Sequence, residues 1–202
     1  MEALKAAYLD DYRNFTRQFV EFSEEEWAIF SSEISLISFE KKEAFTEIGQ
    51  VEKRLGYLAR GSVRFYFVRD GEELTNYFCF SGEMISSYKS FLKQTPCKIA
   101  VEMLEPSDVL VLDFGQLQKL YSDPRVAPKL ESYQRKMTEE LICCYEDRVM
   151  SFVTQSAEER YEDLFRDSRQ VLNRIPQHYI ANYLGVTPVS LSRIRKRIME
   201  RN

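Results

Sequence analysis

The sequence predicts an α+β protein in which helices flank an antiparallel sandwich or barrel and a pair of helices ends the chain. Three observations predict this class. The N-terminal stretch has helical spacing, the central stretch alternates apolar residues with a period of two, and helical spacing returns after Pro128. Six of the seven glycines lie between residues 49 and 115, where they separate short strands. No segment there fits a crossover helix, so we expect antiparallel pairing.

The first 35 residues have the spacing of helices. Ser23 stands three residues before Glu26, and Trp27 begins an apolar run. This is the pattern of a capping box, in which the serine oxygen accepts from the Glu26 amide and the Glu26 carboxylate returns to the Ser23 amide. We therefore expect a helix to begin directly after Ser23.

The central region alternates in short segments that are separated by turn residues. The alternating segments are 63–68, 74–80 and 99–103, and the run 109–112 is wholly apolar. The turns contain Arg60-Gly61, Asp70-Gly71 and Ser81-Gly82. The alternating segments predict strands with one buried face, whereas the wholly apolar run predicts a strand that is buried on both faces.

A long helix is predicted after Pro128, because apolar residues recur at steps of three and four from Leu130 to Phe152. This stripe has two interpretations: it packs on the β region, or it pairs with the same helix of a second copy. Its length favours a homodimer. Cys143 and Cys144 lie on or beside the stripe, and we expect them to be small buried apolar residues.

The composition excludes several classes of protein. The only histidine, His178, rules out most zinc hydrolases and iron enzymes that need two or three histidines, and a cupin-like catalyst with them. We predict no catalytic site, no metal and no cofactor. The four cysteines form no CxxC pair, and neither a secretory signal nor a membrane span is apparent. These features favour a cytoplasmic protein.

Charge is distributed unevenly along the chain. The formal net charge is −4, yet residues 174–202 hold six arginine and lysine side chains against Glu200 alone. An acidic body with a basic end is typical of a protein that binds nucleic acid through that end.

The basic end also fits a helix-turn-helix, residue by residue. Ala181 is small enough for the point where two helices cross, and Gly185 tolerates the positive φ of the turn. Thr187 is a suitable cap, and Pro188 occupies the first turn, where its missing amide proton costs no hydrogen bond. Ile180, Leu184, Val186, Leu191 and Ile194 are predicted to face inward.

The remaining side chains of the second helix are predicted to face DNA. Arg193 can present its fork to guanine O6 and N7, so we expect it to be the main base-reading residue. Lys196 and Arg197 are expected to contact the DNA backbone, and Thr187 and Ser190 the phosphate oxygens at the helix start. The predicted DNA-binding residues are Thr187, Val189, Ser190, Ser192, Arg193, Lys196 and Arg197.

Two stretches of the sequence resemble the Crp/Fnr family of bacterial transcription regulators, in the form found in Bacteroidetes. They are GYLARGSVRFYFVRDGEELTNYFCFSGEMISSYKSFL (56–92) and IPQHYIANYLGVTPVSLSRIRKR (175–197). The resemblance covers essentially the whole chain. It implies a cyclic-nucleotide-binding-like, jelly-roll-like double-stranded β-roll over 1–127, a dimerisation helix over 128–153 and a helix-turn-helix domain over 154–202. The implied partners are double-stranded DNA and a second copy, with RNA polymerase as a further candidate.

The sequence departs from the family at the cyclic-nucleotide site. Members that bind cyclic AMP carry a glutamate for the ribose and an arginine for the phosphate. Alignment on Gly82 and Phe91 places Ser86-Ser87-Tyr88 at the first position and Cys97-Lys98 at the second. Lys98 offers a point charge without a bidentate fork. We therefore expect no response to cyclic AMP and leave the effector open, with these five residues as candidates for its pocket.

The recognition helix departs from the family as well. It begins with Pro188-Val189 where many members have Arg-Glu, so the preferred DNA site is expected to differ, and no β-wing is expected. Two alternatives stay open. One is a regulator that responds to a cyclic nucleotide through a non-standard phosphate pocket, and the other is a β-roll protein-interaction module that does not bind DNA.

Overall fold

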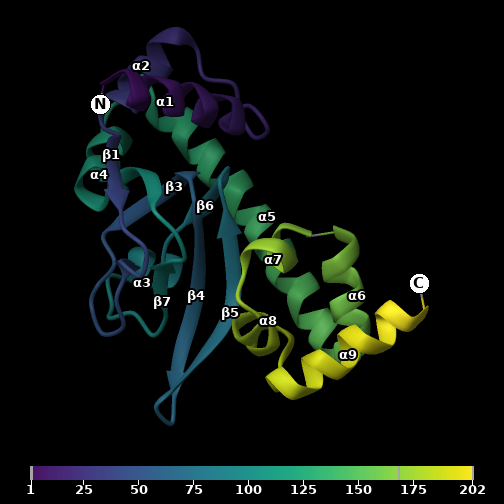
Figure 1. The fold of residues 1–202 in the computed structure, drawn as a ribbon. Helices are drawn as coiled ribbons and strands as arrows, with labels where there is room; N and C mark the ends of the chain where they lie inside the picture. The colour runs from purple at the N-terminus through teal and green to yellow at the C-terminus, as the bar shows by residue number, and fades with distance from the viewer. Residues whose placement is uncertain (1, 168, 202) are drawn as a thin grey trace. The chain divides into compact units, whose positions relative to one another are not determined.

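The computed structural model describes residues 2–167 and 169–201 (Figure 1). The chain forms two compact units. The first contains Met1–Arg64 and Cys79–Leu141, and the second contains Phe65–Phe78 and Ile142–Asn202. The long helix α5 (Ala127–Thr154) therefore contributes to both units. The division into 1–127, 128–153 and 154–202 stays a prediction.

The N-terminal helices of the first unit are α1 (Glu2–Thr16) and α2 (Glu24–Ser32). The capping box predicted before α2 is confirmed. The Ser23 amide donates to Glu26 Oε2 at 2.7 Å, and the Glu26 amide donates to Ser23 Oγ at 3.2 Å. Local sequence therefore sets where α2 begins.

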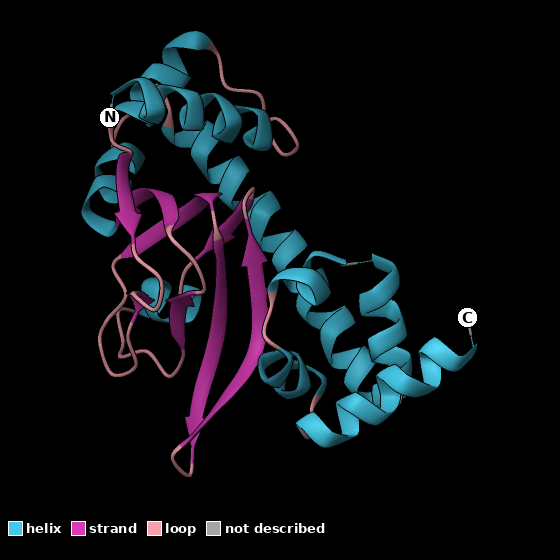
Figure 2. Cartoon of the chain, in the orientation of Figure 1, coloured by secondary structure: helices cyan, strands magenta, loops and turns pink. Residues whose placement is uncertain are grey.

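The strands form two four-stranded sheets, drawn in magenta in Figure 2. One sheet has the order β1-β8-β3-β6 and the other β2-β7-β4-β5, and the pairs with a recorded register are antiparallel. The strands are β1 (Ser35–Phe39), β2 (Ala44–Thr46), β3 (Arg54–Arg60), β4 (Ser62–Arg69), β5 (Glu72–Phe80), β6 (Glu83–Ile85), β7 (Ala100–Met103) and β8 (Ser107–Asp113). Short helices α3 (Tyr88–Lys93) and α4 (Phe114–Tyr121) accompany them. This confirms the α+β class with an antiparallel β-roll.

Strand β8 is buried along nearly its whole length, as its wholly apolar run predicts. It lies between β1 and β3, so both of its edges are hydrogen-bonded. Leu110 belongs to the core shared with α1 and α2, whereas Val109 points toward Gly56. A Cβ on Gly56 would lie 2.8 Å from Val109 Cγ1, so only glycine allows this close approach.

The first part of α5 completes the core of the first unit. Leu130 and Tyr133 are buried among aromatic residues of α1 and α2, and the hydroxyls of Tyr133 and Tyr12 lie 3.2 Å apart. The apolar stripe predicted for α5 therefore divides into a buried part and an exposed part. Its first part packs within the chain, and from Leu141 onward the apolar side chains are exposed.

Cys143 and Cys144 lie in the exposed part of α5, and the expectation that they are buried is wrong for the single chain. They lie beyond the segment that the aromatic core covers. Among the described residues, no helix combines the length and the apolar character that a membrane crossing requires.

The second unit contains α6 (Ala157–Asp167), α7 (Arg169–Arg174), α8 (Gln177–Leu184) and α9 (Pro188–Arg201), together with the ends of β4 and β5. Asp70 and Gly71 join those strands with φ of 54° and 81°, which is the two-residue turn expected there. A second capping box links Ser156 and Glu159, whose amide donates to Ser156 Oγ at 3.3 Å. Helix α7 occupies the connection between α6 and α8.

Candidate nucleic-acid interface

Helices α8 and α9 meet at the turn that the sequence predicts. Gly185 has φ of 71°, in the left-handed region that glycine adopts at little cost. The Gly185 amide donates to Asn182 O and the Val186 amide to Ala181 O, each at 2.9 Å. Ala181 is completely buried, as a crossing residue must be. Helices α8 and α9 are therefore joined by a tight turn at Gly185, where the sequence predicts one.

Helix α9 has a buried face and an exposed face. Leu191, Ile194 and Ile198 are buried at helical spacing, together with Ile180 and Leu184 of α8. Val189 and Met199 on the opposite side are 62% and 69% exposed. The predicted inward residues are thus buried, except that Val186 is half-buried.

The start of α9 is capped by Thr187. The Ser190 amide donates to Thr187 Oγ1 at 3.2 Å, and the two hydroxyl oxygens lie 3.0 Å apart. Thr187 is exposed and Ser190 is half-buried. Their hydroxyls therefore lie at the positive end of the α9 dipole, where an anion is favourably placed.

Arg193, Ser192 and Lys196 lie together on the exposed face of α9. Arg193 forms no ion pair with any other described residue. Lys196 has only a long approach to Glu200, with 3.8 Å between Nζ and Oε1, at side chains that are both largely exposed. Such a surface ion pair contributes little energy. The side chains of Arg193 and Lys196 can therefore both bind an external anion.

Arg197, whose contact with the DNA backbone stays a prediction, forms an ion pair within the chain. It donates through Nε and Nη2 to Glu158 of α6, and Arg201 Nη1 lies 2.9 Å from the same carboxylate. Glu162 of α6 is 3.9 Å from Arg201. The hydrogen bond from Arg197 is the main cause that lowers the pKa of Glu158 below its ordinary value. Arg197 therefore joins α9 to α6.

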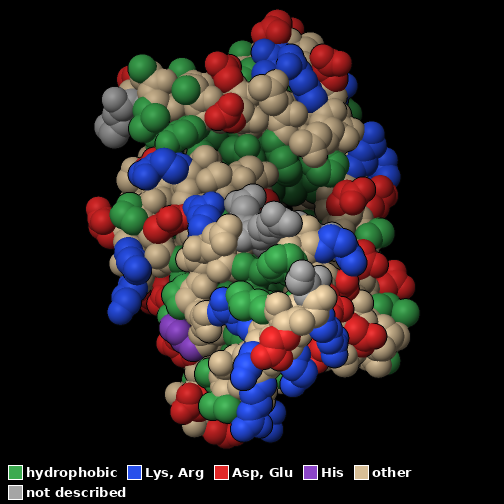
Figure 3. Space-filling view, turned by 45° about the vertical axis from the view of Figure 1, so that its right-hand side comes forward, with side chains coloured by type: hydrophobic (Ala, Val, Ile, Leu, Met, Phe, Trp, Pro, Cys, Tyr) green, Lys and Arg blue, Asp and Glu red, His purple; other side chains and the backbone are tan. Residues whose placement is uncertain are grey.

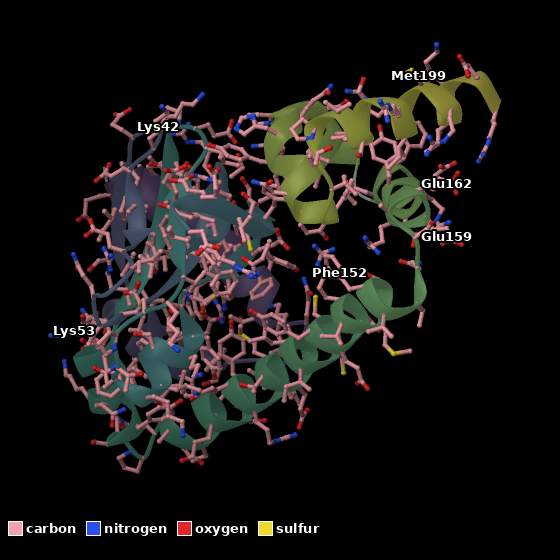
Figure 4. All side chains as sticks on the ribbon, turned by 90° about the horizontal axis from the view of Figure 1, so that it is seen from below. Lys42, Lys53, Phe152, Glu159, Glu162 and Met199 are labelled. Carbon is pink, nitrogen blue, oxygen red and sulfur yellow. The ribbon has the colours of Figure 1, made fainter. Side chains whose placement is uncertain are left out.

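An open depression of about 320 Å³ runs along the exposed face of α9. Its lining residues are Gln177, Ser192, Arg195, Lys196, Met199 and Glu200. Figure 4 shows Met199 on α9 and Glu159 and Glu162 on α6, and Figure 3 shows basic side chains gathered on the face that carries α9. The predicted DNA-binding residues did not include Gln177, Arg195, Met199 or Glu200. The helical step from Ser192 to Arg195 and Met199 was the available signal.

The candidate effector residues lie in the first unit, around α3. Ser86 Oγ donates to Arg54 O at 2.9 Å, Ser87 is buried, and the Tyr88 hydroxyl lies 3.0 Å from Thr138 Oγ1 of α5. These polar groups thus bond within the chain.

The second candidate pair, Cys97 and Lys98, differs in exposure. Cys97 is buried and its amide donates to Gln50 O at 2.7 Å, whereas Lys98 is exposed. The thiol of Cys97 is a weak hydrogen-bonding group and carries no fork of donors for a phosphate.

Solved structures share this fold. The c-di-GMP responsive global regulator CLP of Xanthomonas campestris aligns with a TM-score of 0.68 at 14% identity, over 89% of this chain and 93% of that chain. A cyclic nucleotide-binding domain from Methylobacillus flagellatus aligns with a TM-score of 0.64 at 17% identity, over 71% and 83%. The catabolite activator protein of Thermus thermophilus aligns with a TM-score of 0.55 at 18% identity, over 91% and 86%.

No protein-family model matches the chain, and no curated protein sequence matches it. At these identities the likeness establishes the fold, which is a cyclic-nucleotide-binding β-roll with a long helix and a C-terminal helical domain.

Proposed function

We propose that this chain is a sequence-specific DNA-binding transcription regulator of the Crp/Fnr type that acts as a homodimer in the cytoplasm. The observation that carries the proposal is the exposed face of α9. This face carries Ser192, Arg193 and Lys196, which follow the start of α9 that Thr187 caps. The opposite face of α9 is buried within the second unit. A helix of this kind fits the major groove.

The roles of the side chains follow from their position on α9. Arg193 has no ion pair among the described residues and presents a guanidinium fork, so it reads a guanine edge. Lys196, one turn further along, neutralises a phosphate, and Thr187 and Ser190 donate hydroxyl hydrogen bonds to phosphate oxygens at the helix start. Val189 is exposed and apolar, which suits contact with a thymine methyl group.

The exposed apolar side chains of α5 support the homodimer. Ile142, Tyr145, Val149 and Val153 follow one another at helical steps and are between 55% and 76% exposed. Leaving such a stripe in water is unfavourable, and pairing with the same stripe of a second copy buries it. Two helix-turn-helix motifs would then meet two half-sites about one helical turn apart or a little more.

A response to cyclic AMP is not part of the proposal. The carboxylate and the arginine that the resemblance requires are replaced by Ser87 and Cys97, both of which are buried.

The proposal is tested by selecting bound duplexes from a random DNA pool with the full-length protein and then titrating the binding against salt. A regulator of this type enriches a site with two-fold symmetry. Its affinity for that site falls steeply as salt rises, because bound counterions are released from the DNA. Recovery of no enriched sequence, together with an affinity that is insensitive to salt, would show that the chain does not act through DNA.

A further inference from the structure

The last four carbonyl oxygens of α8 all accept hydrogen bonds. A helix leaves its last four carbonyl oxygens without partners from the helix itself. Here the turn supplies donors for the first two, because the Val186 amide reaches Ala181 O and the Gly185 amide reaches Asn182 O. The carbonyls of Tyr183 and Leu184 remain for other elements.

Two arginines from neighbouring helices bind those remaining carbonyls. Arg148 of α5 donates through Nη2 to Tyr183 O. Arg160 of α6 donates through Nη2 to Leu184 O at 2.9 Å and through Nη1 to Gln155 O at 2.6 Å, just beyond the end of α5. One guanidinium group thus joins the ends of two helices. A cation at a helix C-terminus is also favoured by the helix dipole.

The Arg148 side chain is held on both its polar and its apolar sides. Its guanidinium carbon lies 3.6 Å from the centroid of the Tyr183 ring and 4.4 Å from that of Phe152. Arg160 approaches the Phe152 ring as well, at 4.6 Å. Desolvation by these neighbours lowers the pKa of Arg148 from its ordinary value. The half-buried guanidinium is thus held by one hydrogen bond and two aromatic rings.

We propose that Arg148 and Arg160 are positioning residues that fix the helix-turn-helix on the second part of α5, so that the protein discriminates between DNA sites by the spacing of their half-sites. The inference rests on the proposed function. Arg148 lies on the same stretch of α5 as the exposed side chains of Ile142 and Val149, in the same compact unit as α8 and α9. If that stretch forms the dimer, the two arginines set the distance between the recognition helices.

The first test uses the duplex that the wild-type protein selects, alongside the same duplex with five base pairs inserted between its half-sites. The wild type is expected to lose about 100-fold in affinity on insertion, because both half-sites can no longer be bound at once. Arg148→Met is expected to lose less than about tenfold, since a loosened motif adapts to either spacing. Its affinity for an isolated half-site should equal that of the wild type.

Two further variants keep this test decisive. Arg148→Lys retains a charged donor for Tyr183 O and should restore part of the spacing preference, which separates positioning from a general loss of folding. Arg135→Met removes an exposed arginine from the first part of the same helix and should leave the preference intact. A full spacing preference in Arg148→Met, or its loss in Arg135→Met, would overturn the inference.

Hydrogen exchange tests, without DNA, whether Arg148 holds the end of α8 in place. In Arg148→Met, amide exchange over residues 177–187 should be faster by about tenfold or more, the factor that loss of one charge-assisted hydrogen bond gives. Exchange over residues 107–113 should not change. If the wild type selects no DNA, the proposed function fails. The exchange experiment still shows whether Arg148 stabilises residues 177–187. Unchanged exchange at 177–187 would remove the basis for a positioning role.

Discussion

Arg197 of α9 and Glu158 of α6 form a two-point ion pair, in which Arg197 Nε lies 2.9 Å from Glu158 Oε2 and Nη2 donates to the same oxygen. The pair joins α9 to α6 and engages two of the three guanidinium nitrogens of Arg197. In the proposed DNA interface, the first part of the exposed face of α9 is therefore left for direct contact.

Replacing Arg197 and replacing Lys196 should have different effects on DNA binding. Lys196→Gln should weaken binding to all sequences alike and lower the slope of log affinity against log salt by about one per subunit. Arg197→Gln should leave that slope unchanged, because Arg197 is bound to Glu158. Salt titrations of the two variants, which remove the same charge from adjacent positions, check this. If both variants lower the slope of log affinity against log salt equally, Arg197 contacts the DNA backbone after all.

The pair also predicts a dependence of stability on pH. Arg197 holds the pKa of Glu158 in the folded chain below its ordinary value of 4.5. The carboxylate therefore contributes stability above pH 4.5, and this contribution is lost as the pH falls through the lower pKa of the folded state. The free energy of unfolding should thus fall more steeply between pH 5 and about pH 3 in the wild type than in Glu158→Gln. Denaturant unfolding across this range is the measurement, and parallel curves would contradict it.

The predicted dimer is sensitive to one substitution on α5. Val149 is 61% exposed at the centre of the apolar stripe, so Val149→Asp should place a charge in the paired interface and yield a monomer. Leu92→Asp introduces the same charge at an exposed apolar residue of α3 and should leave the dimer intact. Sedimentation at tens of micromolar distinguishes the two. A wild-type monomer at that concentration would contradict the pairing.

Cyclic AMP should not bind appreciably. Two charge-assisted contacts are missing at Ser87 and Cys97, and losing each typically costs about 1.5–3 kcal/mol. Titration calorimetry with cyclic AMP should show no saturable heat at micromolar ligand. A micromolar dissociation constant would mean that the β-roll recognises the phosphate through other residues.

Local features were predictable from the sequence, whereas long-range contacts were not. The capping box at Ser23 and the turn at Gly185 depend on neighbouring residues, so spacing alone identified them. The bond from Arg160 to Leu184 O spans 24 residues and requires the fold to be known. Arg197 and Glu158 are 39 residues apart in the sequence, so their ion pair could not be predicted for the same reason.

The stripe on α5 shows a different kind of limit. Leu130 is buried within the chain and Val149 is exposed, although both belong to one continuous helical pattern. Apolar periodicity shows which face of a helix is covered but does not identify what covers it. The aromatic core of the first unit covers the first part of α5, and the apolar residues beyond that core are exposed in the single chain.

The most direct test of the proposed DNA interface compares wild-type protein with Arg193→Ala on the selected duplex and on duplexes altered one base pair at a time. Arg193 is exposed and makes no ion pair with any other part of the chain that the structure describes, so its fork is available for a guanine edge. We expect Arg193→Ala to cost about 1–3 kcal/mol on the selected site and to abolish the preference at one base pair in each half-site. A loss that is uniform across all the duplexes would contradict it, because Arg193 would then contact only the DNA backbone.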